Sequence, residues 1–574
     1  METPHHVANP HRSTSGCWTC RLRRKKCDER QPSCRTCDAL SITCHYGDKP
    51  DWMDGGSKQE AKVEQLKRKV KGRGYRRRVP RAPVPEPVPQ VSTPSNHSSS
   101  PLSGLDALAQ FDQDRQDCTR AKKTVCGSTA SGRSDVVLLN FFLEHVFPFI
   151  FPFYQPPALQ GGRAWILELM LHAPVMRQAT LCQSSYYFSL MQGTTSNYAA
   201  WEAVLSQTKN AFEILRGALK VIENSSVSEH LHGAARVMSG IMQVQRFEIQ
   251  VLSFENCRAH LDAALALFNQ VLDSVDPVEP ACRRSRFDAV IHALGPASWQ
   301  PAPSVQIPSA EQAAFQFSSA LLLFDDIIAS TALQEEPRLY RYHESLLCGL
   351  EGVEPAKVDL EGTVGCQNWV LLQLGEIAVL DAWKQRCNKA GNLDVIELVS
   401  RAVSIKASLE LGLSRLDRDS TSSYPVAGDL ADIFMVNERQ NPRRCDGLTS
   451  STTRIWAHAA LLYLSLVVSG WQPASVEVRH HVIQVIDLLR SISPSALLRT
   501  VVWPFCVAGC LAEPIQEAAF RQMAEALRPS SVFGTARKAL EIMEDMWRRR
   551  NVENAAHYDL SSYFRSQGDL VLLV

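Results

Sequence analysis

Hydrophobic residues recur with the period of an amphipathic α-helix along most of the chain, from about residue 134 to residue 574. In WEAVLSQTKNAFEILRGALKVIEN (201–224) the apolar side chains fall along one helical face. NWVLLQLGEIAVLDAWKQ and ARKALEIMEDMWRRR repeat this pattern, between breaks marked by Pro, Gly or Ser. Alternating patterns typical of strands are scarce, and Ser134 is a suitable N-cap for the first helix. We therefore predict a large all-α domain over residues 134–574.

The periodic pattern is absent from the region before this domain. Residues 79–133 include VPRAPVPEPVPQVSTPSNHSSSPLSG, which is rich in Pro and Ser and almost free of apolar periodicity. Such a segment buries too little apolar surface to offset its own ordering. We expect a disordered Pro/Ser-rich linker over 79–133 and a disordered tail over 1–14.

The most apolar stretches, 136–154 and 460–468, do not have the pattern of a membrane span. The first is interrupted by Asn140, Glu144, His145 and two prolines, and the second is about half the length that a bilayer requires. The N-terminal METPHHVANPHR lacks the apolar core of a secretory signal. We therefore expect no membrane partner, and a reducing compartment, in which clustered thiols bind metal more often than they form disulfides.

Charge is distributed unevenly along the 574 residues, whose net charge is only +1. Residues 1–80 contain 19 Lys and Arg against 9 Asp and Glu, and the remainder of the chain is mildly acidic. The length predicts about two to four domains. A basic N-terminal region on an acidic body indicates that this region meets a polyanion.

The basic region contains a cysteine repeat with the spacing C-x2-C-x6-C-x6-C-x2-C-x6-C, in which one triplet recurs 17 residues later. The 28 residues of this stretch contain too few large apolar side chains to form a stable hydrophobic core. A structural Zn²⁺ contributes about 10–16 kcal/mol of apparent binding free energy and can fold such a segment. The cysteines are Cys17, Cys20, Cys27, Cys34, Cys37 and Cys44.

Two tetrahedral zinc ions need eight ligand positions, which six cysteines supply if two thiolates are shared. The alternative of one zinc ion bound by four cysteines leaves two reactive thiols beside a folded site. The pattern of six cysteines, with a basic segment after the second and Pro32 between the halves, resembles the fungal zinc binuclear cluster (Zn2Cys6) transcription factors. This resemblance implies a DNA-binding domain over 15–46 with two Zn²⁺ ions, in which Cys17 and Cys34 are the bridging thiolates.

The two halves of the repeat differ after their second cysteine, which RLRRKK follows in the first half and DALSIT in the second. We expect a short helix after each C-x2-C turn. A helix fits the DNA major groove, where Arg and Lys can contact guanine O6 and N7. By the resemblance, Arg23 and Arg24 read the bases of a CGG-like triplet in double-stranded DNA, whereas Arg21, Lys25 and Lys26 hold phosphates. The alternative is that these charges only neutralise the cluster and direct nuclear import.

Residues 47–78 form a basic linker or arm that ends in KRKVKGRGYRRR (67–78). This run is typical of a phosphate-binding arm or a nuclear localisation signal. Val63, Leu66 and Val70 follow coiled-coil spacing for only about one and a half heptads. A dimerising zipper is therefore expected to be weak or absent.

The helical region contains four segments that resemble the fungal-specific transcription factor regulatory domain: YLSLVVSGWQP (463–473), VVWPFCVAGCLAEP (501–514), SVFGTARKALEIMEDMW (531–547) and the terminal GDLVLLV (568–574). The resemblance implies a nuclear regulator of RNA polymerase II genes, of the kind that activates metabolic or secondary-metabolite gene clusters. The partners that it implies are GC-rich DNA, transcriptional co-regulators, a homodimer and a small-molecule effector.

Motifs of catalysis are absent: the chain contains no HExxH, Walker A, GxSxG or GxGxxG pattern in a suitable context. Cys506 and Cys510 lie among apolar residues and are predicted to be core residues, and the adjacent His480 and His481 point to different helical faces. We therefore predict no enzyme, no catalytic residue and no organic cofactor. The remaining alternatives are an enzymatic or ligand-binding helical body that the zinc module localises to chromatin, and a zinc module that binds RNA or protein.

Overall fold

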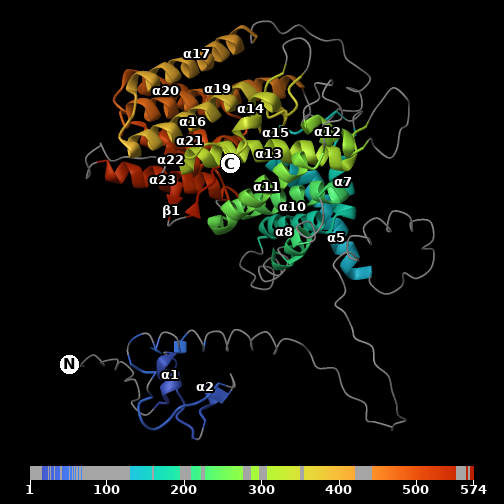
Figure 1. Ribbon diagram of the computed structural model, residues 1–574, viewed down its shortest axis with the longest axis vertical. Coiled ribbons are helices and arrows are strands. Elements are labelled where there is room, and N and C mark those ends of the chain that lie inside the picture. The colour runs from blue at the N-terminus through green and yellow to red at the C-terminus, as the bar shows by residue number, and fades with distance from the viewer. Residues whose placement is uncertain are drawn as a thin grey trace, which may run out of the picture. The chain divides into compact units, whose positions relative to one another are not determined.

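The computed structural model describes two parts of the chain, which belong to separate compact units, residues 1–101 and 102–574 (Figure 1). We call the described part of the first the cysteine unit and that of the second the helical unit. The predicted tail 1–14, the basic run 67–78 and the linker up to residue 128 lie outside the described residues. The described residues are 16–66, except 24, 26, 32, 39–41, 51, 55, 57, 60–61 and 64–65, and 129–574, except 158–160, 194–207, 212, 221–226, 276–285, 296–306, 350–354, 420–441, 530, 551–563 and 567–568.

The cysteine unit contains two short helices, α1 (Trp18–Leu22) and α2 (Arg35–Asp38). Each begins directly after the cysteine that opens its half of the repeat. The Cys17 sulfur accepts a hydrogen bond from the Cys20 N–H, and the Cys34 sulfur accepts one from the Cys37 N–H, both at 3.3 Å. Because these sulfurs cap the helices, both helices include the second cysteine of their half, and the prediction that they begin after it is wrong. α1 consequently ends at Leu22, before most of the basic run.

The residues with coiled-coil spacing pack within the cysteine unit. Leu66 is only 6% exposed and belongs to the same apolar cluster as the cysteines, with Val63 and Trp52 packed beside it. Asp54 accepts hydrogen bonds from the Gly56 and Gln59 N–H groups at 2.8 and 3.1 Å, which starts the helical turns that carry Val63 and Leu66. These two side chains therefore face their own unit, and Val70 lies outside the described residues.

The helical unit is built almost entirely of helices, as its periodicity predicted. Its one strand pair among the described residues is antiparallel and short. In chain order the elements are α5 (Thr129–Phe141), the π-helix η2 (Phe142–Val146), α6 (Phe147–Ile150), α7 (Ala164–His172), α8 (Pro174–Met191), η5 (Val227–His230), α10 (Leu231–Gln250), η6 (Phe254–Asn256), α11 (Cys257–Asp273), α12 (Arg286–Ala293), α13 (Ala310–Leu333), α14 (Tyr340–Leu347), α15 (Glu361–Val364), α16 (Asn368–Ala390), α17 (Val395–Asp419), α19 (Pro442–Ser469), α20 (Val476–Ser491), η8 (Ser495–Val501), α21 (Val502–Cys510), α22 (Glu517–Glu525), α23 (Gly534–Arg549), β1 (Arg565–Ser566) and β2 (Asp569–Leu570).

The helix α13 lies at the centre of the helical unit (Figure 1). It packs against α10 and α7 on one side and against α16 on the other. Its start is set by a capping box, in which Ser309 and Gln312 bond to each other's backbone N–H. By length and composition α13 could cross a membrane, but 89% of its most apolar window is buried inside the unit. We interpret it as the core helix that joins two groups of helices.

These two groups are contiguous in sequence. The earlier group packs α10 against α8 and α11, and the later group packs α19 against α16, α17, α20 and α21. The C-terminal helices α21 and α23 pack on each other, and α23 also contacts α10. The C-terminal segment therefore returns to the earlier group of helices.

Candidate metal centre and nucleic-acid interface

The thiols of the cysteine unit converge on one point. The sulfur of Cys17 lies 3.8 Å from those of Cys34 and Cys37, and the sulfur of Cys20 lies 3.6 Å from that of Cys34. A zinc–sulfur bond of about 2.3 Å gives a tetrahedral edge of about 3.8 Å between sulfur atoms. The observed spacings therefore fit thiolates that share a tetrahedral zinc ion.

The six cysteines fall into two tetrads, and within each tetrad the sulfur atoms lie within 4.8 Å of one another. Cys17 and Cys34 belong to both tetrads. The Cys20 and Cys37 sulfurs also lie 3.8 Å apart, although they belong to different tetrads and share no metal in this arrangement. The first tetrad is Cys17, Cys20, Cys27 and Cys34, and the second is Cys17, Cys34, Cys37 and Cys44.

Backbone N–H groups surround the thiols. Besides the two helix caps, the Glu29 N–H donates to the Cys27 sulfur and the Cys34 N–H donates to the Cys44 sulfur, both at 3.4 Å. Such donors favour the thiolate, which is the form that binds metal.

Burial opposes ionisation of most of these thiols. It raises the pKa of Cys17 and of Cys37 far above the usual range and the pKa of Cys20 to about 11. Burial also acts to raise the pKa of Cys44, but the Cys34 N–H and the neighbouring thiols lower it on balance. A buried group of thiols of this kind exchanges its protons for a divalent cation, so the donor set suits Zn²⁺.

The basic residues after Cys20 that the structure describes lie at the C-terminal end of α1. The Arg21 guanidinium lies over the Trp18 ring, 4.8 Å from its centroid, and the Trp18 N–H donates to the Gly47 carbonyl at 2.9 Å. Arg23 is half-buried, and its Nη1 atom is shielded and without a hydrogen-bond partner among the described residues. Lys25 is exposed.

The structure thus brings Arg21, Arg23 and Lys25 together beside the cysteines. Arg24 and Lys26 lie outside the described residues. Sequence reasoning missed a second basic contact: Lys62 lies over the Trp52 ring, 5.7 Å from its centroid. The tryptophan of KPDWMDGG is the feature of the sequence that could have indicated this contact.

The helical unit offers no comparable cluster among its described residues. Cys506 and Cys510 are buried core residues, as predicted. His481 contacts His458 of α19, with 3.1 Å between the two Nδ1 atoms. Sequence reasoning missed this pair because the two histidines come from different helices.

Comparison with known proteins places these features in a family. A profile described as "Fungal Zn(2)-Cys(6) binuclear cluster domain" matches residues 15–53, and one described as "Fungal specific transcription factor domain" matches residues 137–571. The chain is also 33% identical to transcription factor dibT of Pestalotiopsis microspora, over 98% of this chain and 99% of the relative. The chain belongs to the fungal Zn2Cys6 transcription factors.

Further relatives of this zinc cluster transcription factor are named as regulators of biosynthetic clusters. It is 29% identical to the pestheic acid cluster transcriptional regulator 3 of Pestalotiopsis fici, over 95% of this chain and 96% of the relative. It is 25% identical to the ustiloxin B cluster transcription factor ustR of Aspergillus flavus, over 94% and 95%. No solved structure matches the chain significantly.

These matches confirm the expected resemblance to the Zn2Cys6 transcription factors. They also confirm the combination of a zinc module with a large helical body and the two zinc ions of the cluster domain. The family and its named members are DNA-binding transcription factors and not enzymes.

Proposed function

We propose that this zinc cluster transcription factor is a nuclear protein that binds DNA sequence-specifically and regulates RNA polymerase II genes by reading CGG-like triplets. The observation that carries the proposal is the pair of cysteine tetrads that share Cys17 and Cys34. We assign all six cysteines as zinc ligands and these two as the bridging thiolates. Six thiolates then provide the eight positions that two tetrahedral ions require.

The proposed DNA contacts come from the end of α1 and the residues after it. Arg23 has a shielded guanidinium nitrogen without an acceptor, and an unsatisfied donor of this kind costs free energy. A guanine edge would satisfy it once the side chain turns outward. Arg24 is assigned a base contact from its position in the sequence, and Arg21, Lys25 and Lys26 are assigned phosphate contacts.

The proposed domain boundaries divide these roles along the chain. Residues 15–46 form the DNA-binding module, 47–78 the basic arm, and the region from α5 to residue 574 the regulatory domain. The sequence pattern predicted a linker up to residue 133 and a domain from residue 134, but α5 already begins at Thr129. The tail 1–14 and the linker 79–128 are proposed to be disordered, so that the regulatory domain acts by tethering.

The proposed targets are genes of a metabolic or secondary-metabolite cluster, which the protein activates. The support is that two relatives are named for the pestheic acid and ustiloxin B clusters. The proposed partners are GC-rich double-stranded DNA, transcriptional co-regulators, a second copy of the chain and a small-molecule effector.

A second candidate function is a ligand-binding or enzymatic helical body that the zinc module localises to chromatin. It is favoured by a cavity in the helical unit that aromatic side chains and two arginines line. It differs from the first proposal in requiring no sequence-specific readout by the zinc module.

Selection from random oligonucleotides with the full-length protein tests the proposed readout. We expect enrichment of a CGG-like triplet that a zinc chelator abolishes. The double variant Arg23→Ala/Arg24→Ala should lose discrimination at the guanines, since a bidentate pair contributes about 1–3 kcal/mol.

The matched control is Arg30→Ala/Arg35→Ala, which removes two exposed arginines near the second half of the repeat. It should select the same triplet as the wild type. Zinc-dependent folding without any enriched sequence would rule out direct readout and favour the second candidate function.

A further inference from the structure

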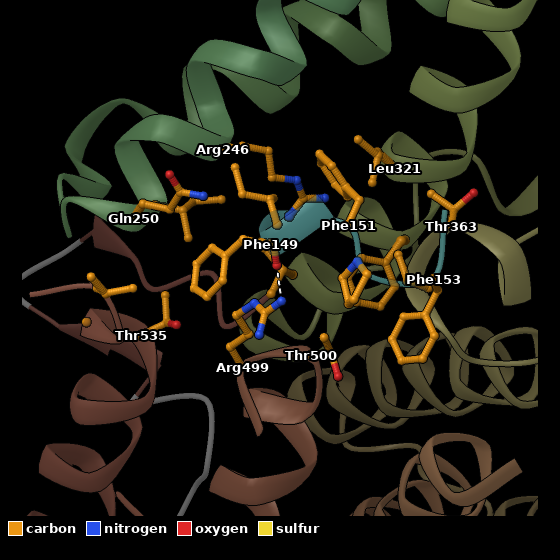
Figure 2. A pocket seen from close by; sticks show the side chains of 18 of the residues that line it. Phe149, Phe151, Phe153, Arg246, Gln250, Leu321, Thr363, Arg499, Thr500 and Thr535 are labelled. Carbon is orange, nitrogen blue, oxygen red and sulfur yellow. Dashed lines mark hydrogen bonds between the residues drawn. The ribbon is translucent and has the colours of Figure 1, made fainter. Parts of the chain in front are cut away.

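A cavity lies where the earlier helices of the helical unit meet its C-terminal segment (Figure 2). Its free volume is about 780 Å³ when the open mouth is counted and about 90 Å³ in the enclosed part, so a small ligand would lie partly in the mouth. The wall is mainly apolar and aromatic and also includes threonine hydroxyl groups. Its lining includes Phe149, Phe151, Phe153, Leu321, Thr500 and Thr535.

Arg499 of η8 points into this cavity (Figure 2). Its terminal nitrogens donate to the Ala496 and Phe149 carbonyls, and its guanidinium lies 4.0 Å from the centroid of the Phe149 ring. Its Nε is shielded from solvent and has no hydrogen-bond partner among the described residues. Burial lowers its pKa to about 10. Arg499 is therefore a deeply placed cation with an unused donor.

The second arginine that lines the cavity, Arg246, differs from Arg499 because it has an ion-pair partner. Arg246 of α10 pairs with the fully buried Asp325 of α13 at 2.6 Å, so its charge is balanced within the protein. No carboxylate of the described residues lies within ion-pair distance of Arg499. Two guanidinium groups thus line the cavity, and among the described residues a carboxylate pairs with only one of them, Arg246. An unpaired charge at a buried position is costly.

We propose that this cavity binds a small aromatic carboxylate, whose carboxylate accepts hydrogen bonds from Arg499 and whose ring packs among the phenylalanines. A single charge favours a monoanion over a phosphate, which carries more charge and needs more donors. The apolar wall favours a ligand with a flat hydrophobic body over a bare inorganic anion. The biological meaning of this site, an effector of transcription, rests on the proposed function.

The position of the cavity gives the ligand a way to act on the whole unit. Its walls come from the segment around α6, from α10 and α13, from η8 and from the start of α23. A ligand bound there contacts the earlier group of helices and the C-terminal segment, and it stabilises the arrangement in which they meet.

Fluorine NMR titration of the full-length protein tests the proposal with 4-fluorophenylacetate and its neutral twin 4-fluorophenylacetamide. We expect the acid to bind at least about tenfold more tightly than the amide, because only the acid forms a charge-assisted pair. Arg499→Gln should reduce binding of the acid to the level of the amide. The control Arg490→Gln, which removes an exposed arginine of α20, should leave it unchanged.

A second variant covers the case in which Arg499→Gln does not fold. Thr535→Leu narrows the cavity without changing its charge, and it should weaken binding of both probes. The proposal would be overturned if the wild type bound acid and amide equally or did not bind the acid. It would also be overturned if either variant bound the acid as tightly as the wild type, or if inorganic phosphate displaced the acid as well as unlabelled acid does. The titration contains no DNA, so a negative result would not affect the conclusion from the oligonucleotide selection. A negative selection would likewise not contradict the ligand site.

Discussion

At the scale of single residues, the six cysteines of the repeat are not equivalent. Cys17 and Cys34 occupy the position that opens each half, cap α1 and α2 with their sulfurs, and belong to both tetrads. Cys44 is less buried and belongs to one tetrad. Removing a shared thiol therefore affects two metal positions, and removing a terminal one affects a single position.

This difference predicts the zinc content of two variants. Cys17→Ser should lower the zinc content from about two ions per chain to well below one, whereas Cys44→Ser should retain about one. Elemental mass spectrometry of purified full-length protein measures both. Cys348→Ser, which replaces an exposed thiol of the helical unit, is the control and should keep both ions. Equal zinc loss from Cys17→Ser and Cys44→Ser would contradict the assignment of shared thiolates.

The His458 and His481 pair places two titratable groups in the core between α19 and α20. Burial, followed by the charge of the neighbouring histidines, lowers the pKa of each to about 4. Because the folded pKa is below the value of 6.5 in the unfolded chain, the unfolded state binds more protons between pH 6.5 and 4. The pair therefore contributes stability above pH 6.5, and this contribution is lost as the pH falls toward 4.

His481→Gln should reduce this acid sensitivity. Between pH 6.5 and 4 the wild type should lose up to about 3 kcal/mol more of its unfolding free energy than the variant. Urea unfolding of the full chain at several pH values, followed by circular dichroism, measures the difference. Comparison with the variant is necessary because burial raises the pKa of Asp325 and of Asp326 to about 6, which has the opposite effect on stability. Replacing the exposed His172 by Gln should give the slope of the wild type, and an unchanged slope in His481→Gln would argue against the buried pair.

At the scale of elements, α21 and α23 approach closely because α21 has a glycine at the contact. A Cβ atom at Gly509 would lie 1.8 Å from the Met543 sulfur. The Trp547 N–H also donates to the Gly509 carbonyl at 2.8 Å. This packing helps to place the start of α23 at the wall of the proposed ligand cavity.

Gly509→Ala should lower the free energy of unfolding by about 1–3 kcal/mol through overpacking. Gly217 is a control, since it is an exposed helical glycine and no heavy atom lies within 4 Å of its Cβ position. Gly217→Ala should be neutral or stabilising by up to about 1 kcal/mol. Urea denaturation of both variants compares them, and equal effects would show that α21 and α23 are less tightly packed.

The burial of Leu66 indicates that the segment after the cysteines packs on its own unit and does not form a zipper between two chains. Leu66 is buried against its own unit, so Leu66→Ala should destabilise that unit by about 2 kcal/mol without changing the mass of the particle in solution. Resistance of the bound zinc to chelation measures the stability of the cysteine unit. Sedimentation velocity measures the mass of the particle in solution. Lys58→Ala, at an exposed position of the same segment, should change neither. A loss of mass in Leu66→Ala would instead indicate a zipper between two chains.

At the scale of the whole molecule, the two units are stabilised by different means. The cysteine unit relies on metal, whereas the helical unit has an extended hydrophobic core. Removing zinc should therefore abolish DNA binding and leave helical circular dichroism almost unchanged.

Fluorescence anisotropy with a selected oligonucleotide and far-UV circular dichroism of the same sample check this expectation. Adding zinc back should restore binding. A large loss of helical signal on chelation would show that the helical unit depends on the cysteine unit. Binding should also weaken steeply with salt, since each phosphate contact releases a counterion.

The sequence by itself determined the features that depend on local spacing. The number of cysteines predicted two metal positions with two shared thiolates, because eight ligand positions must come from six thiols. The resemblance to the zinc cluster family then pointed to Cys17 and Cys34 as the shared pair. The helical period predicted the class of the large unit, since one apolar face must be buried against another element. Neither inference needed a long-range contact.

Only the tertiary structure decided which distant residues meet. It turned Val63 and Leu66 toward the cysteines, although their spacing also suits a zipper. The sequence could not distinguish the two, because periodicity shows that a helical face is buried but not which surface covers it. It brought His458 to His481, and it paired Arg246 with Asp325 but left Arg499, which lines the same cavity, without a carboxylate partner among the described residues. These juxtapositions depend on how helices far apart in sequence pack, and that packing is a property of the whole core.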